Sequence, residues 1–436
     1  LMMSLGSVIL SIPVLSTTEN IGWLLPLTCV SLFFIAFGNG LFKGNLQAIV
    51  GQMYDNLEKE AEKKGPEALK LAKSRRDSGF QIFYVFINIG GLIAPFVAPL
   101  LREWWLKVHS MMYNADLPAL CHQYIKEGGD MASDNLSNLN ELVVKVGGTL
   151  TTDLSVFCTQ YLDVFNTGIH YSFIASVVAM LISLFIFIAC RKVFPTPGKK
   201  EKQESVTYTP AEKAAMAKEI KQRLYALFAV LGIVIFFWFS FHQNGQSLSL
   251  FARDFVVTDS IAPEIWQAVN PFFVIVLTPL IMLFFGTLAR RGQQISTPKK
   301  IAIGMGIAAT GFIIMAVGSF VSDLPLHQDI VAAGTSPVKV TPLLLMATYL
   351  VLTIAELYIS PLGISFVSKV APPKYQGIMQ GGWLGATAIG NQLLFIGAVL
   401  YESIPIWMTW TVFVVACCIS MCTMLFMLKW LERVAK

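Results

Sequence analysis

Charged side chains are scarce in this sequence. Only 14% of its 436 residues are Asp, Glu, Lys or Arg, whereas 55% are hydrophobic. A soluble chain carries about 25% charged residues. A compact soluble core has no room for this much apolar sequence, so the composition excludes a soluble globular protein. It predicts an all-α polytopic membrane protein instead.

Patterns for catalysis and metal binding are also missing. The sequence has five His and seven Cys, and it contains no HExxH, no GxSxG and no His or Cys cluster at metal-ligand spacing. We therefore do not expect an enzyme, and we expect neither a cofactor nor a metal site. Cys121 and Cys158 share one polar segment, and they would form a disulfide if that segment faced an oxidising compartment.

Long apolar runs dominate what is present. A spanning helix needs about 20 mostly apolar residues. The sequence offers ten candidate spans, at 1–16, 22–50, 77–101, 168–194, 222–252, 264–289, 299–321, 341–368, 374–400 and 405–430. The chain starts inside the first run without a signal-peptide pattern, so we expect it to be the interior of a longer protein.

The basic residues between the runs are distributed unequally. The connections on one side, at 51–76, 191–223, 290–300, 369–374 and from 429 onward, hold 25 of the 32 Lys and Arg residues. The connections on the other side hold five. The positive-inside rule places the basic side, and with it both ends of the chain, in the cytoplasm. The net charge of +5 is thus a topology signal, and we expect no nucleic-acid partner.

A charged linker divides the runs unevenly. Residues 195–221 are rich in Lys, Glu, Pro and Thr, and they leave four runs before and six after. Many secondary transporters join two six-helix halves through such a linker. We therefore expect an N-terminal half at 1–194 and a C-terminal half at 222–436, with two helices missing before residue 1. A protein of ten helices is the alternative. Residues 102–167 are expected to form a long polar external loop.

Two charges lie deep within predicted spans, away from the span ends. Lys43, in the stretch GNGLFKGN, shares a helical face with Asn39 and Gln47. Glu356 lies between Thr353 and Ser360 in the same way. Charged residues in spans usually face a bundle interior or an aqueous cavity. The alternatives are a lysine that extends to the headgroups and a protonated glutamic acid that serves packing.

Other polar residues occur inside the runs, and several of them recur at helical spacing. They are Tyr84 and Asn88; Trp238, His242 and Gln243; Asn270; and Gln380, Trp383, Thr387 and Asn391. Each by itself is as compatible with a helix–helix hydrogen bond as with a binding role. Together they predict the lining of a polar cavity in an apolar bundle. His242 has the residue type to carry protons near neutral pH, or it is simply hydrogen-bonded in the bundle.

At these residues the sequence resembles the proton-dependent oligopeptide transporter family, a branch of the major facilitator superfamily. The similar segments are GNGLFKGN, RRDSGFQIFYVFINIGGLIAP, FFWFSFHQNGQSLSLFARD, WQAVNPFFVIVLTP, AELYISPLGISFVSKVAP and GGWLGATAIGN. The resemblance places Leu1 at the start of the family's third helix. It implies the major facilitator fold with about ten of twelve transmembrane helices present.

The resemblance also implies a function and a set of site residues. It implies a proton-coupled symporter that imports di- and tripeptides by alternating access in the cell (inner) membrane. Lys43 would bind the carboxylate end of the peptide and Glu356 its ammonium end. The further substrate-binding residues would be Tyr84, Asn88, Trp238, Gln243, Asn270, Ser360 and Trp383. The candidates for proton coupling are Glu356, Lys43 and His242.

The sequence departs from the family pattern at two positions. Gly44 stands where the family has proline, and His242 where many members have an acid. The family's first-helix ExxER motif would lie before Leu1. The alternatives are the same fold carrying another small anionic or zwitterionic solute, such as nitrate or an amino-acid conjugate, and a non-transporting peptide receptor. The expected partners are small peptides, protons and the lipid bilayer, and the oligomeric state is unknown.

Overall fold

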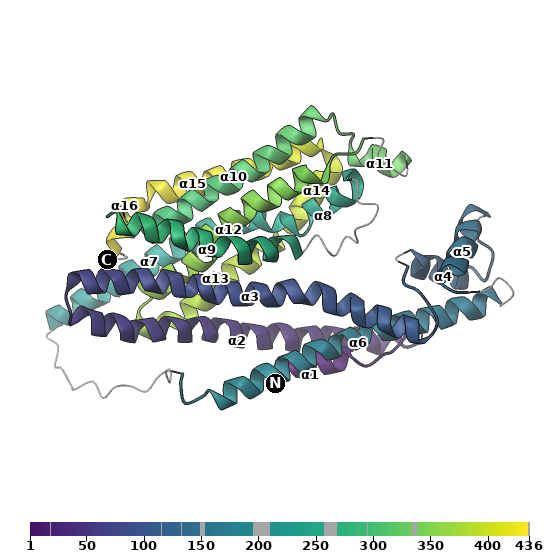
Figure 1. The fold of residues 1–436 in the computed structure, drawn as a ribbon, viewed down its shortest axis with the longest axis horizontal. Helices are drawn as coiled ribbons and strands as arrows, with labels where there is room; N and C mark the ends of the chain where they lie inside the picture. Colours follow the sequence, from purple (N-terminus) through teal and green to yellow (C-terminus); the bar gives the residue numbers. More distant parts are fainter. Residues whose placement is uncertain are drawn as a thin grey trace. The chain divides into compact units, whose positions relative to one another are not determined.

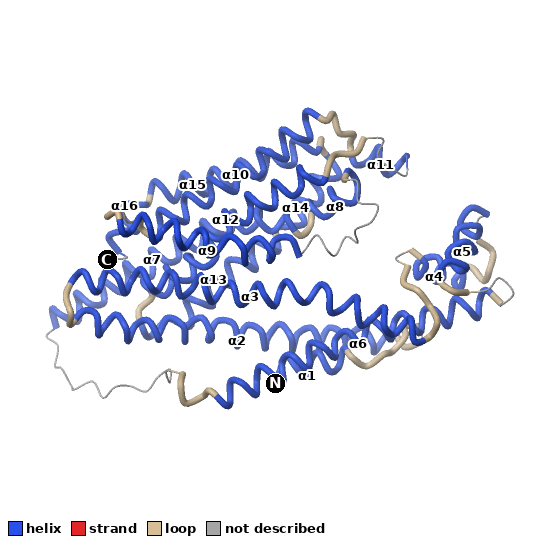
Figure 2. Tube along the Cα trace, viewed as in Figure 1, coloured by secondary structure: helices blue, strands red, loops and turns tan. Residues whose placement is uncertain are grey.

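The protein is helical throughout the part of the chain that the structure describes. The computed structural model describes residues 1–17, 19–114, 116–131, 133–148, 153–194, 210–256, 268–293, 295–333 and 338–434. These ranges hold no β-strand, only one isolated bridge between Val256 and Val340 (Figure 2). The expectation of an all-α fold is confirmed.

The described helices follow one another along the chain as labelled in Figure 1. They are α1 (Met2–Leu10), α2 (Ile21–Glu62), α3 (Pro66–Val108), α4 (Leu117–Lys126), α5 (Ser133–Lys145), α6 (Leu154–Ala189), α7 (Pro210–Phe241), α8 (Ser247–Phe255), α9 (Val269–Arg290), α10 (Thr297–Val321), α11 (His327–Ala333), α12 (Pro342–Val370), α13 (Gln376–Gln392), α14 (Leu394–Ser403), α15 (Ile406–Phe426) and α16 (Leu428–Val434). A short 3₁₀ turn at His242–Asn244 separates α7 from α8.

Nine of the ten expected spans are confirmed as helical segments long and apolar enough to cross a membrane, within the described residues. Two of the nine, at 214–255 and 376–403, contain breaks, at Gly245 and Leu393. The expected span at 1–16 is wrong, because α1 has only nine residues. Pro13 explains the early end, since proline disfavours helical backbone at the residue before it and cannot donate a helical hydrogen bond.

Two expected loops contain helix instead. The 51–76 connection is helical except for a turn around Gly65, because α2 runs to Glu62 and α3 begins at Pro66. Its Ala, Leu, Lys and Glu residues are strong helix formers. The 102–167 segment contains α4 and α5 and the start of α6. Apolar residues at helical spacing, such as Leu139, Val143 and Val146, bury one face there.

The chain divides into two compact units. The first unit comprises residues 1–41 and 93–193, and the second comprises 42–92 and 194–436. These units differ from the two expected halves, because residues 42–92 cluster with the C-terminal part of the chain. The first 15 residues of the expected linker, 195–209, lie outside the described residues. All of the expected substrate-binding residues belong to the second unit.

Helix α12 is the centre of the second unit's core. It packs along α10 and also contacts α9 and α13. Glycines spaced by seven residues on α10 permit close approach: a Cβ at Gly304 would lie 3.0 Å from the Ala355 carbonyl oxygen, and one at Gly311 would lie 3.0 Å from Leu352. α10 and α12 are therefore closely packed around Leu352 and Ala355.

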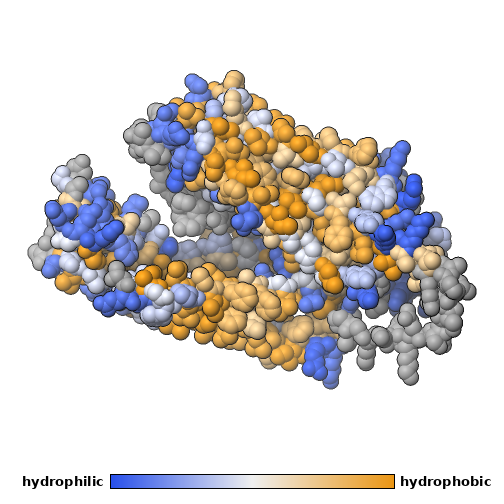
Figure 3. All heavy atoms as spheres, turned by 180° about the vertical axis from the view of Figure 1, so that it is seen from behind, coloured by the Kyte–Doolittle hydropathy of each residue, from blue (hydrophilic) through white to orange (hydrophobic). Residues whose placement is uncertain are grey.

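The outer surface suits a lipid environment. Large apolar side chains are exposed on the spans, including Leu283 on α9 and Phe320 on α10. On the face drawn in Figure 3, hydrophobic residues cover the middle of the helices and hydrophilic residues gather near their ends. Soluble proteins rarely expose apolar surface so widely, and a multi-pass membrane protein requires it.

Candidate functional site

A carboxylate lies at the midpoint of α12. Glu356 is buried, with 6% of its surface exposed. Its Oε2 accepts a hydrogen bond of 2.7 Å from Asn270 Nδ2, and its Oε1 accepts one from the Tyr84 hydroxyl. One turn further on, Pro361 lacks an N–H, so the Leu357 carbonyl loses its usual helical donor. The middle of this apolar helix is therefore its most polar part.

Three helices supply the polar cluster around this carboxylate. Asn270, near the start of α9, also donates to Thr353 Oγ1 at 3.1 Å, and Tyr84 reaches in from α3. The Thr353 hydroxyl donates in turn to the Tyr349 carbonyl at 2.7 Å. We call Tyr84, Asn270, Thr353 and Glu356 the carboxylate cluster. It brings together three residues that the sequence marked separately.

Two further expected residues lie beside the cluster. Asn88 is buried, and its Nδ2 donates 2.9 Å to the Tyr84 carbonyl of its own helix, not to the carboxylate. Ser360 is buried one turn after Glu356 on α12. Each of the two residues lies one helical turn from a cluster residue on its own helix. Neither forms a hydrogen bond with the Glu356 carboxylate.

The charge of Glu356 has no basic counterpart in the cluster. Within the described residues its hydrogen bonds come only from an amide and a phenol, and it forms no ion pair. A buried carboxylate is costly unless it is paired, and neutral donors offset only part of the cost. The site can therefore accept either a proton or a cationic group of a ligand.

Lys43 lies in α2 and is half-buried. The adjacent Gly44 is buried, and a Cβ there would lie 3.8 Å from the backbone of Gly381 on α13. Within the described residues Lys43 makes no hydrogen bond or ion pair, although it lies within electrostatic range of His242. The structure does not bring Lys43 into contact with Glu356.

Aromatic side chains form a second group, on α7, on the 3₁₀ turn that follows it and on α13. The Trp238 ring stacks on His242 with centroids 4.8 Å apart and meets Trp383 edge-on at 6.3 Å. Gly363 of α12 makes room for the Trp383 ring, because a Cβ there would lie 2.0 Å from it. We call Trp238, His242 and Trp383 the aromatic group.

Gln243 is engaged differently from its neighbours. It is completely buried, its Oε1 accepts 2.6 Å from the Ser247 hydroxyl, and its Nε2 donates 3.4 Å to the Leu394 carbonyl. It packs against Gly397 of α14, one turn after the break that separates α13 from α14. Its amide thus joins two broken helices, and its expected contact with substrate stays a prediction.

An ionic cluster that the sequence did not reveal lies near the C-terminal end of α12. Asp77 Oδ1 accepts from Lys369 Nζ at 2.7 Å and from the Ser365 hydroxyl at 2.6 Å, and Oδ2 lies 3.4 Å from Lys300 Nζ. The neighbouring Arg76 is buried and forms ion pairs with two carboxylates of α2, at Asp55 and Glu58. The run Arg-Arg-Asp at the edge of an apolar segment was the available signal.

A second ionic cluster lies near the N-terminal end of α12. Asp254 contacts Arg253 at 2.8 Å, His327 Nδ1 at 3.1 Å and the Tyr401 hydroxyl at 3.3 Å. Lys339 donates 2.9 Å to the Asp254 carbonyl. The carboxylate cluster thus lies between two ionic clusters, about 20 Å along α12 from Lys369 at 1.5 Å per residue.

The fold and these clusters define a multi-pass helical membrane protein. Its buried polar site is of the kind that membrane carriers use to bind a solute. A model of the POT family matches residues 1–208 and 198–408. The chain therefore belongs to the POT family, and the resemblance seen in its motifs is confirmed.

Curated relatives and solved structures agree with this assignment. The chain is 27% identical over 407 residues to the peptide transporter YePEPT of Yersinia enterocolitica. This match covers 88% of this chain and 70% of the relative. It is 25% identical to the dipeptide and tripeptide permease B of Salmonella typhimurium, over 87% of this chain and 68% of the relative. A crystal structure of the peptide transporter POT in complex with sulfate matches all of this chain and 78% of that one, with a TM-score of 0.51 and 20% identity. The structural likeness shows the same fold.

Proposed function

We propose that the protein is a proton-coupled symporter that imports di- and tripeptides by alternating access. The observation that carries this proposal is the buried Glu356, whose described partners are all neutral. The relatives named as a peptide transporter and as a dipeptide and tripeptide permease support the substrate class. The excess of basic residues on one side supports a location in the cell (inner) membrane with both ends of this chain cytoplasmic.

A peptide ammonium suits the carboxylate cluster. An ammonium donates three charge-assisted hydrogen bonds, and these are roughly twice as strong as neutral ones. Asn270 and Tyr84 hold the carboxylate from two sides and so fix the direction of its remaining lone pairs. In our proposal Lys43 attracts the carboxylate at the other end of the peptide, and the weak dielectric of the bundle strengthens both attractions.

The remaining expected residues would contact the parts that all peptides have in common. Tyr84 and Asn88 present a hydroxyl and an amide for the peptide backbone, while Trp238 and Trp383 provide a wide apolar wall. A site that recognises both ends and the backbone tolerates many side chains. Selection by length follows from it, because the two charged ends fix the span.

A symporter carries the proton and the peptide together, and one carboxylate cannot hold a proton and an ammonium at the same time. In our proposal the peptide ammonium takes the place of the proton on Glu356, and the proton passes to another group of the bundle before the site changes sides. Lys43 and His242 are the other candidates for carrying the proton. In our proposal the ionic clusters at Asp77 and Asp254 exchange partners as each end of the path opens, which is how packed helices pass between two arrangements.

Uptake of Ala-Ala by proteoliposomes tests the proposal. The full-length protein is reconstituted, and an inward proton gradient is applied. Glu356→Gln should lower gradient-driven accumulation about 100-fold, because loss of a charge-assisted bond in a buried site costs about 3 kcal/mol. Wild-type uptake in this variant would contradict the assigned role.

A matched variant separates this role from a general effect of charge. Glu402, at the end of α14, is exposed, so Glu402→Gln makes the same chemical change outside the cluster and should leave uptake unchanged. Tri- and tetrapeptides, nitrate and an amino-acid conjugate are compared in the same assay. Uptake of nitrate but not of Ala-Ala would favour the other-solute alternative, and peptide binding without uptake would favour a receptor.

A further inference from the structure

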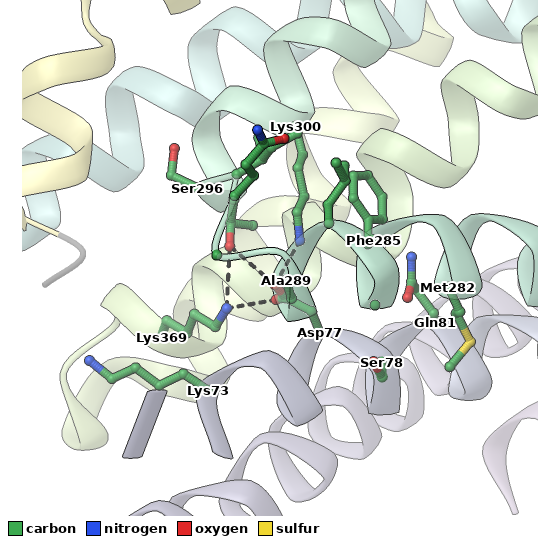
Figure 4. Close-up of a pocket in the computed structure, with 16 residues that line it drawn as sticks. Lys73, Asp77, Ser78, Gln81, Met282, Phe285, Ala289, Ser296, Lys300 and Lys369 are labelled. Atoms are coloured by element: carbon green, nitrogen blue, oxygen red, sulfur yellow. Dashed lines mark hydrogen bonds and ion pairs between the residues drawn. The ribbon is translucent and has the colours of Figure 1, made fainter. Parts of the chain in front are cut away.

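A cavity of about 450 Å³ opens beside the Asp77 cluster (Figure 4). Residues of α3, α9, α10 and α12 line it, and all of them belong to the second unit. It lies about 20 Å along α12 from Glu356, so it is separate from the proposed peptide site.

The cavity is lined by more positive than negative charge. Its charged lining residues are Lys73, Lys300 and Lys369 against the single carboxylate of Asp77. Figure 4 shows Lys300 and Lys369 both directed at this carboxylate, at 3.4 and 2.7 Å. Two ammonium groups held on one carboxylate leave a net positive charge in a partly buried place, which favours an anion.

The start of α10 adds to this potential. Ser296 and Thr297 line the cavity at the N-terminus of a helix of 25 residues. The Ser296 hydroxyl does not cap the helix and donates instead to Glu432. The first turn contains no acidic residue, so the positive end of the helix dipole acts at the cavity together with the lysines.

An apolar groove continues from this cavity. A second cavity of about 480 Å³ shares Met282 and Gly286 with the first and is lined mainly by apolar residues of α3 and α9. Leu283 and Ile82, at its wall, are 69% and 48% exposed. Gly286 has open space where a Cβ would be, so no side chain projects from this shared position into either cavity.

The dimensions of the groove match one leaflet of a bilayer. From Gly286 to Thr278 it follows α9 for about 12 Å at 1.5 Å per residue. The hydrocarbon core of a bilayer is about 30 Å thick, so one leaflet contributes about 15 Å. Arg290 lies at the end of the groove nearest the end of α9, where headgroups would lie.

We propose that the two cavities bind one anionic phospholipid. Its phosphate lies against Lys300 and Lys369, within reach of Lys73, and one acyl chain follows the groove between α3 and α9. The positive charge around the Asp77 carboxylate favours binding of an anion, and the exposed apolar groove favours binding of an acyl chain. A phospholipid supplies both in one molecule, and inorganic phosphate supplies only the first. The bound phosphate shares both lysines with Asp77 and so couples lipid composition to the ionic cluster.

Lipid binding to the full-length protein tests this proposal. Delipidated protein in a neutral detergent is titrated with phosphatidylglycerol, with phosphatidylcholine of the same chains, or with inorganic phosphate, and bound lipid is counted by native mass spectrometry. We expect one phosphatidylglycerol to bind at least tenfold more tightly than phosphatidylcholine. Equal binding of the two lipids would overturn the proposal. Displacement of the lipid by millimolar phosphate would also overturn it, because the site would then be for a free anion.

Two variants act on different parts of the site. Lys300→Gln removes a phosphate contact and should weaken phosphatidylglycerol binding about tenfold. Gly286→Leu leaves every charge in place and fills the passage between the cavities, so it should also lose the bound lipid. Lys299→Gln makes the same charge change on the adjacent exposed residue of α10 and should bind as the wild type does. Retention of the wild-type affinity by both Lys300→Gln and Gly286→Leu would refute the site.

Discussion

The charge balance around Asp77 gives a quantitative prediction. Asp77→Asn keeps the size of the side chain and removes the negative charge that holds Lys369 at 2.7 Å and Lys300 at 3.4 Å. Two buried ammonium groups would then face each other. Breaking a buried pair by removing one partner costs about 3–5 kcal/mol. The side chains here retain 11–14% exposure, and the cavity beside them admits water, so we expect the lower end, about 3 kcal/mol.

The prediction is measured as a change in thermal unfolding. At about 2 °C per kcal/mol for a large domain, Asp77→Asn should lower the apparent Tm by about 6 °C. The assay uses purified protein in one neutral detergent, at low salt and without added anionic lipid. Low salt matters because screening would weaken the repulsion between the two lysines.

A double-mutant cycle separates charge imbalance from lost packing. Lys369→Met leaves the Asp77–Lys300 pair intact and should cost about 1 kcal/mol, similar to one hydrogen bond. In the double variant one ammonium remains instead of two, so adding Lys369→Met to Asp77→Asn should restore part of the loss. The reasoning is refuted if Asp77→Asn unfolds within 1 °C of the wild type, or if the double variant is less stable than Asp77→Asn.

Two further predictions concern packing and thiol chemistry. Gly363→Ala should destabilise the protein by about 1–3 kcal/mol, because the new methyl group would overlap the Trp383 ring. The control Gly232→Ala has open space around the new methyl group and should be neutral or slightly stabilising. Equal Tm values for the two variants would show that the Trp383 ring moves freely. The hydrogen bond with the Cys158 thiol raises the pKa of the Cys121 thiol, so Cys121 should alkylate slowly at neutral pH and faster as the pH rises. Cys158→Ser should change this pH dependence, and rapid neutral-pH alkylation of wild-type Cys121, followed by mass spectrometry, would contradict the contact.

The membrane-crossing segments were accessible from the sequence because crossing a bilayer is a local property. Each span must satisfy its own backbone hydrogen bonds and present an apolar surface over a fixed length, so run length alone predicted nine of the helices. Glu356 stood out for the same reason, as a charge that an apolar run could not otherwise accommodate. The motifs around it also led to the correct family.

The connections were harder to predict because they are mixed in composition. In 102–167 apolar and polar residues are almost equal in number, and apolar residues such as Leu139 and Val143 repeat at helical spacing and form a small core. The segment 51–76 reads as a basic loop by charge, although its residues favour helix individually. The charge of a residue and its helix propensity are independent, so counting the basic residues of 51–76 did not reveal that the same residues favour a helix.

Sequence alone determined that polar groups lie within the spans, and only the tertiary structure decided which of them meet. Glu356 is joined by Tyr84 and Asn270, which lie 272 and 86 positions away in the chain. Lys300 and Lys369 contributed to the prediction of topology, but their contact with Asp77 depends on how three helices pack. The preference of a hydrophobic run for lipid follows from the hydrophobicity of each of its residues, which the sequence gives directly. A hydrogen bond between helices exists only when packing brings both partners within about 3 Å.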